Sequence, residues 1–440
     1  MLTYRDVFRA PQFGPLFTAG ALQGAASTTS GLALGVLVFT STGSPLLSAL
    51  SMFGSSSAQL VGATLLMSAA DRLPPRAALT CSALAFGIGT AVLALPGLPL
   101  PAVFTVLLGQ GALAAVAGGV RYGLLSEVLP KDAWLLGRSV LNMCSGSVQV
   151  AGYAVGGALV AVMSARGTLL VAAGLYLAGA AVTRFGLVRR PPRVVGRPSV
   201  GATWRTNALL WSSAPRRRVY LALWVPNGLV VGCESLFVPY RPDGAGPLFA
   251  CAALGMLAGD TLTGRFLPAR RRGTAAVRLL LLLAAPYLLF ALRPGLPWAL
   301  VLAAVASTGF SASLLLQERL TALTPDAMTG QALGLHSSGM LSTQGVAAAL
   351  AGAVAQRTSA GTAIALMALA SVAVTLALAP GLRREGPGCV SRPRRRHRRR
   401  CHRRRRRRRR RRQSPRRRLR RRPSRRRHRA RCRRCRCRGC

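Results

Sequence analysis

Glu234 is the ionisable residue whose surroundings in the sequence most favour chemistry. It stands about fifteen residues into an apolar run, Val219–Tyr240. At 1.5 Å of rise per helical residue this is a depth of roughly 22 Å. An ionisable side chain inside lipid is costly and is therefore a candidate for a functional role. At that depth Glu234 can carry a proton or bind a cationic substrate; the alternative is a glutamate near the outer headgroups whose side chain reaches water.

Other polar side chains also stand inside apolar runs and are candidates for the same site. Asn227 lies seven residues before Glu234, on the same face of a helix. The remaining candidates are Gln23, Gln110, Gln149, Gln344 and His336. The amides can line a cavity or can hydrogen-bond between helices, which is a common structural use in membranes. Histidine exchanges protons near neutral pH, so His336 suits either a proton role or a bond between helices.

Long apolar runs must position these residues. We count twelve runs, each about as long as the roughly 20 residues that a helix needs to cross a bilayer. They are Phe13–Phe39, Pro45–Ala70, Ala77–Leu95, Pro101–Leu125, Gly137–Met163, Thr168–Val188, Val219–Tyr240, Gly246–Leu262, Ala275–Leu292, Trp298–Gln317, Gly330–Ala355 and Gly361–Leu378. Lipid offers no hydrogen bonds to the backbone, so the runs must be helices. The sequence therefore predicts an all-α membrane protein with twelve transmembrane helices.

The chain repeats itself at about half its length. Identical residues recur at an offset of 194 or 195 residues. The pairs are Leu73 and Leu267, Pro74 and Pro268, Arg76 and Arg270, Pro130 and Pro325, Ser147 and Ser342, and Gln149 and Gln344. A shared offset in separate stretches indicates two parallel six-helix repeats, the build of many secondary transporters. We expect an N-terminal half over residues 1–188, a linker over 189–218 and a C-terminal half over 219–385.

Basic residues alternate between the loops. Loops after odd-numbered runs hold only Arg166, Arg241, Arg293 and Arg357, whereas loops after even-numbered runs hold the remaining loop arginines and Lys131. Basic loops stay on the cytoplasmic side of a membrane. We therefore expect a multi-pass protein of the cell membrane with both termini, and the linker, in the cytoplasm.

A charged hairpin, Asp71-Arg72-Leu73-Pro74-Pro75-Arg76, joins the second and third runs. An aspartate at one helix end and an arginine opposite it form a charge-assisted pair, which must break before the helices can separate. Related charges follow the eighth run and end the fourth. The candidate clamp residues are Asp71, Arg72, Arg76, Asp260, Arg265, Arg270, Arg121 and Glu127. The alternative is that the arginines serve only as a positive anchor on the cytoplasmic side.

Together, the twelve runs, the long linker and the hairpin resemble the major facilitator superfamily, and most closely its drug and siderophore exporters. The resemblance covers roughly residues 4–385. The hairpin is similar to the family loop G-x-x-x-D-R-x-G-R-R/K, with Asp71, Arg72 and Arg76 at its charged positions and Pro74 at its inner glycine. In that family the loop latches the cytoplasmic helix ends in the outward-open state.

Two further motifs carry the resemblance. Gly152-Tyr153-Ala154-Val155-Gly156-Gly157 resembles the exporter motif G-P-x-x-G-G, with Tyr153 in place of proline. Gln110-Gly111-Ala112-Leu113-Ala114-Ala115 resembles the end of R-x-x-Q-G-x-G-A-A, where Leu107 replaces the arginine that the family links to proton transfer. The resemblance implies export of a small molecule by alternating access in a lipid bilayer, coupled to an ion, with the proton expected. An importer of the same fold and a non-transporting receptor or scaffold are the alternatives.

The end of the chain has a different composition. Gly386–Cys440 contains 32 arginines and no acidic residue, and such a block cannot fold alone. It is suited to bind RNA or anionic lipid, but its residue types are also those of GC-rich DNA read in a wrong frame. We favour the second interpretation and expect no specific nucleic-acid partner.

Motifs typical of enzymes do not occur in the sequence. It has no G-x-x-x-x-G-K-[ST] phosphate loop, which disfavours ATP-driven transport. The membrane body has no His/Cys cluster with metal spacing. The sequence therefore predicts neither an enzyme nor a bound metal or cofactor.

Overall fold

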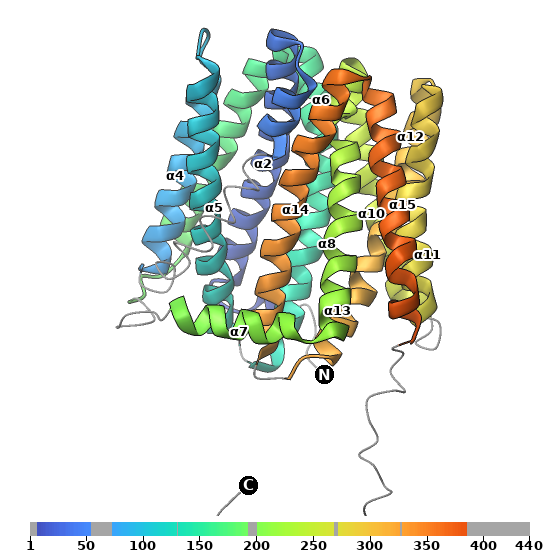
Figure 1. Cartoon of the computed structure of the whole chain (residues 1–440). Helices are drawn as coiled ribbons and strands as arrows, with labels where there is room; N and C mark the ends of the chain where they lie inside the picture. Colours follow the sequence, from blue (N-terminus) through green and yellow to red (C-terminus); the bar gives the residue numbers. More distant parts are fainter. Residues whose placement is uncertain are drawn as a thin grey trace, which may run out of the picture. The chain divides into compact units, whose positions relative to one another are not determined.

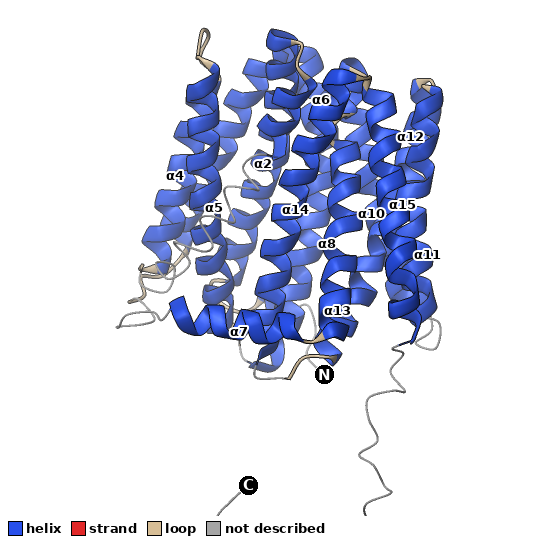
Figure 2. Cartoon of the chain, viewed as in Figure 1, coloured by secondary structure: helices blue, strands red, loops and turns tan. Residues whose placement is uncertain are grey.

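The computed structural model describes residues 7–53, 73–129, 131–191, 200–267, 272–325 and 328–384. Over these ranges the chain forms helices joined by loops and turns, without a strand (Figure 2). The chain divides into a unit Met1–Gly386, which contains every described helix, and a unit Pro387–Cys440, which lies outside the described residues.

The long helices of the first unit lie side by side as a bundle (Figure 1). In the N-terminal half they are α2 (Phe13–Thr42), α4 (Pro75–Leu93), α5 (Leu100–Val128) and α6 (Lys131–Gly186). The linker contains α7 (Val200–Ser212). The C-terminal half contains α8 (Ala214–Glu234), α9 (Phe237–Tyr240), η1 (Pro242–Gly244), α10 (Ala245–Phe266), α11 (Arg272–Ala284), η3 (Ala285–Leu292), α12 (Leu296–Thr308), η4 (Gly309–Ser311), α13 (Ala312–Ala322), α14 (Thr329–Arg357) and α15 (Ala360–Arg384).

The helices account for the predicted spans. Ten helical segments of the described residues are long and apolar enough to cross a membrane. One of them, Ser147–Gly186, covers most of the fifth and sixth predicted spans, and Ser164, with φ 79°, interrupts α6 between the two. The second predicted span is helical over residues 45–53, and the rest of it lies outside the described residues. The predicted all-α transmembrane fold is confirmed.

Short turns of tighter helix interrupt the ninth and tenth spans. Pro286 has no backbone N–H, and at this point α11 gives way to the 3₁₀ segment η3. In the tenth span η4 separates α12 from α13. These breaks lie next to Tyr287 and Ser307, whose side chains both reach Glu234.

Glycines let α10 pack very closely on α12. A Cβ atom added at Gly255 would overlap the carbonyl oxygen of Ala304, and one at Gly259 would overlap that of Thr308. This is the close contact expected from glycines four residues apart.

Gly255→Ala is expected to destabilise the protein strongly. The added methyl group meets backbone rather than a movable side chain, so α10 and α12 must separate, at a cost of about 1–3 kcal/mol. The matched control is Gly264→Ala on the same helix, since a Cβ there has nothing within 4 Å. Thermal unfolding of both variants in detergent measures the difference. Equal unfolding temperatures would contradict the packing described.

The two halves touch at one end of the bundle, which we call the distal end. It carries the turns at Gly43, Gly97 and Ser164, whereas residues 7–12 and the end of α15 lie at the opposite, terminus-bearing end (Figure 1). Near the distal end, Gln356 donates a hydrogen bond to Ser44 across the halves at 3.1 Å. A Cβ added at Gly352 would come within 2.6 Å of the Cα of Leu46.

A second contact between the halves joins α6 to α10. A Cβ at Gly157 would lie 2.6 Å from the Cα of Gly246, and the reverse distance is the same. One helical turn deeper, the ring of Tyr153 stacks on that of Phe249, with centroids 4.7 Å apart and planes 18° apart. The glycine-rich motif of the fifth span therefore forms part of the contact between the halves.

The linker contains a helix that the sequence patterns did not predict. α7 lies across the lower ends of the bundle helices in Figure 1. Trp211 stacks on Trp224 of α8, with ring centroids 5.4 Å apart, and Gln331 of α14 donates to Asn207 at 3.1 Å. Arg216 donates to the carbonyl oxygens of Leu209 and Leu210. These contacts attach α7 to the C-terminal half.

Candidate functional site

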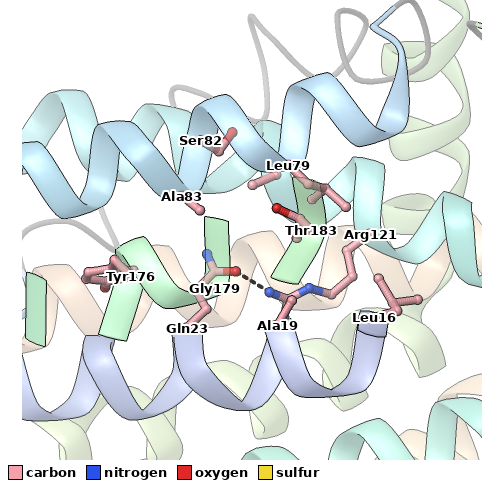
Figure 3. A pocket seen from close by; sticks show the side chains of 11 residues that line it. Leu16, Ala19, Gln23, Leu79, Ser82, Ala83, Arg121, Tyr176, Gly179 and Thr183 are labelled. Atoms are coloured by element: carbon pink, nitrogen blue, oxygen red, sulfur yellow. Dashed lines mark hydrogen bonds between the residues drawn. The ribbon is translucent and has the colours of Figure 1, made fainter. Parts of the chain in front are cut away.

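A polar site lies inside the N-terminal half, where α2, α4, α5 and α6 meet. Arg121 of α5 points toward Gln23 of α2 and donates a hydrogen bond to its side-chain oxygen (Figure 3). Ser82, Thr183 and Tyr176 line the same small cavity. Its volume, about 20 Å³, is enough for roughly one water molecule. Two residues predicted separately, as a clamp arginine and as a site glutamine, are thus direct partners.

A larger cavity of about 110 Å³ continues from Gln23 into the same half. Gln110 lines it and donates to the carbonyl oxygen of Phe86 at 3.2 Å and to the hydroxyl of Thr90 at 3.4 Å. Ser27, Ser30, Ser51 and Tyr176 add hydroxyl groups to its wall. The cavity wall is therefore rich in neutral hydrogen-bonding groups and meets the Arg121 site at Gln23.

Glu234 lies in the apolar core of the C-terminal half, at the last residue of α8. Its side chain is 9% exposed. The hydroxyl groups of Tyr287 and Ser307 donate to one carboxylate oxygen over long distances, 3.4 and 3.5 Å. Both donors are neutral, so these bonds leave the charge of an ionised carboxylate uncompensated in an apolar setting.

Asn227 and Glu234 have different partners although they share α8. Gln344 of α14 donates to the Asn227 side chain at 2.9 Å. Gln344 is the repeat mate of Gln149, and Gln149 hydrogen-bonds Tyr153 at the contact between the halves. The Asn227–Gln344 bond therefore joins α8 to α14, whereas the Gln149–Tyr153 bond lies within α6.

His336 of α14 is buried, with 5% of its surface exposed. Trp224 donates to its backbone carbonyl oxygen at 3.0 Å, while the ring atom Nδ1 has no hydrogen-bond partner. A buried polar atom without a partner is costly. His336 therefore stays the second candidate for a proton site, after Glu234.

The structure describes only some of the candidate clamp residues. Asp71, Arg72 and Arg270 lie outside the described residues. Arg76 is the second residue of α4, and Glu127 pairs with Arg190 at 3.1 Å. The clamp predicted around Asp71 and the related one predicted around Asp260 therefore both stay predictions.

In the second half Asp260 and Arg265 lie on α10. The Oδ1 atom of Asp260 is buried without a hydrogen-bond partner, and the guanidinium of Arg265 lies 5.8 Å from the Phe266 ring centroid. Asp260 is thus a second carboxyl group with a buried oxygen, and its Oδ1 lacks the hydroxyl donors that Glu234 has.

Several residues of the site were not predicted from the sequence. Tyr287 and Ser307 reach Glu234 from other spans, and Tyr176 joins the N-terminal cavity. A hydroxyl group inside an apolar run was the available signal, but the chain has many such groups. Which of them meet is decided only by helix packing.

The described helices form a bundle of membrane-spanning length and apolar character with polar groups buried inside it. Residues 16–314 match the family model described as Major Facilitator Superfamily. Because this match covers more than half of the sequence, the chain belongs to the major facilitator superfamily. No curated protein matches the chain.

Solved transporter structures share the fold at low sequence identity. A POT family transporter in complex with 5-aminolevulinic acid aligns with TM-score 0.67 and 13% identity, over 84% of this chain and 96% of the other. A peptide transporter POT in complex with sulfate aligns with TM-score 0.66 and 14% identity, over 87% and 99%. A bacterial homolog of the human lysosomal transporter Spinster, in an inward-facing and unoccupied conformation, aligns with TM-score 0.63 and 14% identity, over 85% and 96%.

Proposed function

We propose that this protein exports a small molecule by alternating access and couples the export to protons. The observation that carries the proposal is Glu234, a carboxyl group buried in the C-terminal half and contacted by two long hydroxyl bonds. A buried ionisable group without an opposite charge is costly, so its presence needs a function. Binding and release of a proton supplies one.

The contacts at the distal end support the alternating movement. They are glycine-to-glycine and glycine-to-backbone approaches with one neutral hydrogen bond, Gln356 to Ser44. Such a surface closes tightly, and within the described ranges of the chain it separates without breaking an ion pair. We infer that the described conformation is the one closed at the distal end, and that the opposite state opens there.

The export direction rests on the glycine motif of the fifth span, which resembles the exporter motif. Gly152 and Gly156 pack on Thr28 and Thr29 of α2, while Gly157 meets Gly246 of the other half. The motif therefore connects packing within one half to the contact between the halves. This position suits a motif that distinguishes exporters from other members of the fold.

The terminus-bearing end is expected to face the cytoplasm, since most loop arginines lie there. In a background without native cysteines, a membrane-impermeant maleimide should label Thr358→Cys in sealed cells. The matched variant Ser212→Cys, which is exposed on α7 at the opposite end, should stay unlabelled until the cells are opened. Labelling of Ser212→Cys in sealed cells would reverse the proposed orientation.

The direct test compares solutes in host cells that express the protein with those in cells that express Glu234→Gln. Untargeted mass spectrometry of cytosol and medium measures all detectable solutes, so the substrate does not have to be chosen in advance. Export predicts at least one solute enriched in the medium only with the wild-type chain. Enrichment in the cytosol would identify an importer, and an unchanged profile would favour a receptor or scaffold.

The identified solute then tests coupling. Proteoliposomes that contain the protein and a trapped pH-sensitive dye should show a proton flux when that solute is added. Solute transport without any proton movement would contradict the proposed coupling.

A further inference from the structure

A basic cavity of about 600 Å³ lies between the start of α4 and the end of α6. Arg76, Arg184, Arg189 and Arg190 line it from two separate helix ends. It lies at the terminus-bearing end of the bundle, apart from the polar sites that the proposed transport uses. Arg76 is also a candidate clamp residue, whereas Arg184, Arg189 and Arg190 have no part in the transport cycle described above.

Among the residues that the structure describes, the charge of this cavity is only partly balanced. Glu127 pairs with Arg190 at 3.1 Å, which leaves three further arginines around the same space. The first turn of α4, which borders the cavity, contains no acidic residue. Several guanidinium groups that converge on one space favour a ligand with a phosphate or carboxylate group.

Exposed apolar side chains adjoin the lining residues in the sequence. Phe185 follows Arg184 and Val188 precedes Arg189, and they are 84% and 60% exposed; Leu73, which precedes the lining residue Pro74, is 41% exposed. A free anion gains nothing from such side chains, whereas the acyl chains of a lipid bury them. Thr80, which lines the cavity, shares a hydrogen bond of 3.1 Å with Thr183 of α6.

We propose that this cavity binds the headgroup of one anionic phospholipid from the surrounding leaflet. The phosphate lies among Arg76, Arg184 and Arg189, and the acyl chains run along Phe185 and Val188. Basic pockets between transmembrane helices at the cytoplasmic face are suited to anionic headgroups. Bound there, the lipid bridges the third and sixth spans, because the arginines come from both.

The test titrates the purified full-length protein in neutral detergent with short-chain phosphatidylglycerol and follows its thermal unfolding temperature. The lipid is expected to raise this temperature, because it binds the folded bundle. Arg184→Gln/Arg189→Gln should require about tenfold more lipid for the same shift. Both residues are exposed, so their loss leaves the core intact. Arg184→Lys/Arg189→Lys, which keeps both charges, should retain most of the binding.

The matched control is Arg217→Gln/Arg278→Gln, which removes two exposed arginines from the C-terminal half. It should change the lipid requirement by less than about twofold, since its arginines are outside the cavity. The arginine tract at the end of the chain is present in every variant, so differences between variants report the cavity. Equal losses in both double variants, or none in either, would overturn the proposal. An equal shift with phosphatidylcholine or inorganic phosphate would also overturn it.

Discussion

Replacing Glu234 with glutamine is expected to abolish the pH dependence of transport without unfolding the protein. Glutamine keeps the size of the side chain and an oxygen that can accept from Tyr287 and Ser307. It removes the group that gains and loses a proton. Transport driven by a pH gradient should fall by about tenfold or more, which corresponds to a loss of about 1.4 kcal/mol of proton-dependent bias between two states.

Uptake or efflux in vesicles between about pH 5.5 and 8.5 measures this effect, since a protonic coupling site acts in that range. Asp243→Asn is the matched control, because Asp243 is an exposed carboxylate in a distal turn. His336→Asn tests the rival site. If Glu234→Gln keeps the wild-type pH dependence of transport while His336→Asn loses it, the proton site is His336 and not Glu234. Unchanged profiles in both would contradict coupling at either residue.

Gly157→Ala is expected to weaken closure of the distal end and to slow transport. The new methyl group would meet the backbone of Gly246, which cannot rotate away. Overpacking of this kind costs about 1–3 kcal/mol, enough to change the ratio of closed to open states by roughly 5- to 150-fold. Since transport requires both states, a strong bias toward one lowers turnover.

Gly174→Ala is the control for this effect. It also lies on α6, in the sixth span beyond Ser164, and a Cβ there has nothing within 4 Å. Gly246→Ala should cause the same loss of transport from the other half. Because Gly246 is on α10, that result would assign the loss to the contact between the halves and not to misfolding of α6. Wild-type turnover in both Gly157→Ala and Gly246→Ala would show that this contact does not control the cycle.

Local patterns were enough to predict the class of fold. The length and apolar character of each run determined the helices, because lipid leaves the backbone no other hydrogen-bonding choice. The spacing of Gly255 and Gly259 is typical of a close helix contact, and the structure has that contact against α12. Glu234 stood out because a carboxyl group is rare in such a run.

Contacts between distant segments could not be predicted in the same way. Gly157 meets Gly246, and Arg121 meets Gln23, only when two helices pack at one particular register. Asn227 and Glu234 share a helix face by spacing, yet their partners come from α14 in one case and from η3 and α12 in the other. Helix α7 was not expected because its sequence is rich in polar and small residues flanked by proline.

The central claim, that the two halves alternate between closure at opposite ends, can be measured even while the substrate is unidentified. Spin labels at Ser41→Cys and Thr358→Cys report the distal end, and labels at Pro191→Cys and Ala322→Cys report the terminus-bearing end; all four residues are exposed. Pulsed electron spin resonance across about pH 5.5–8.5 gives both distance distributions. The two pairs should change in opposite directions, and Glu234→Gln should remove the response to pH. Distances that stay fixed, or that lengthen at both ends together, would contradict alternating access.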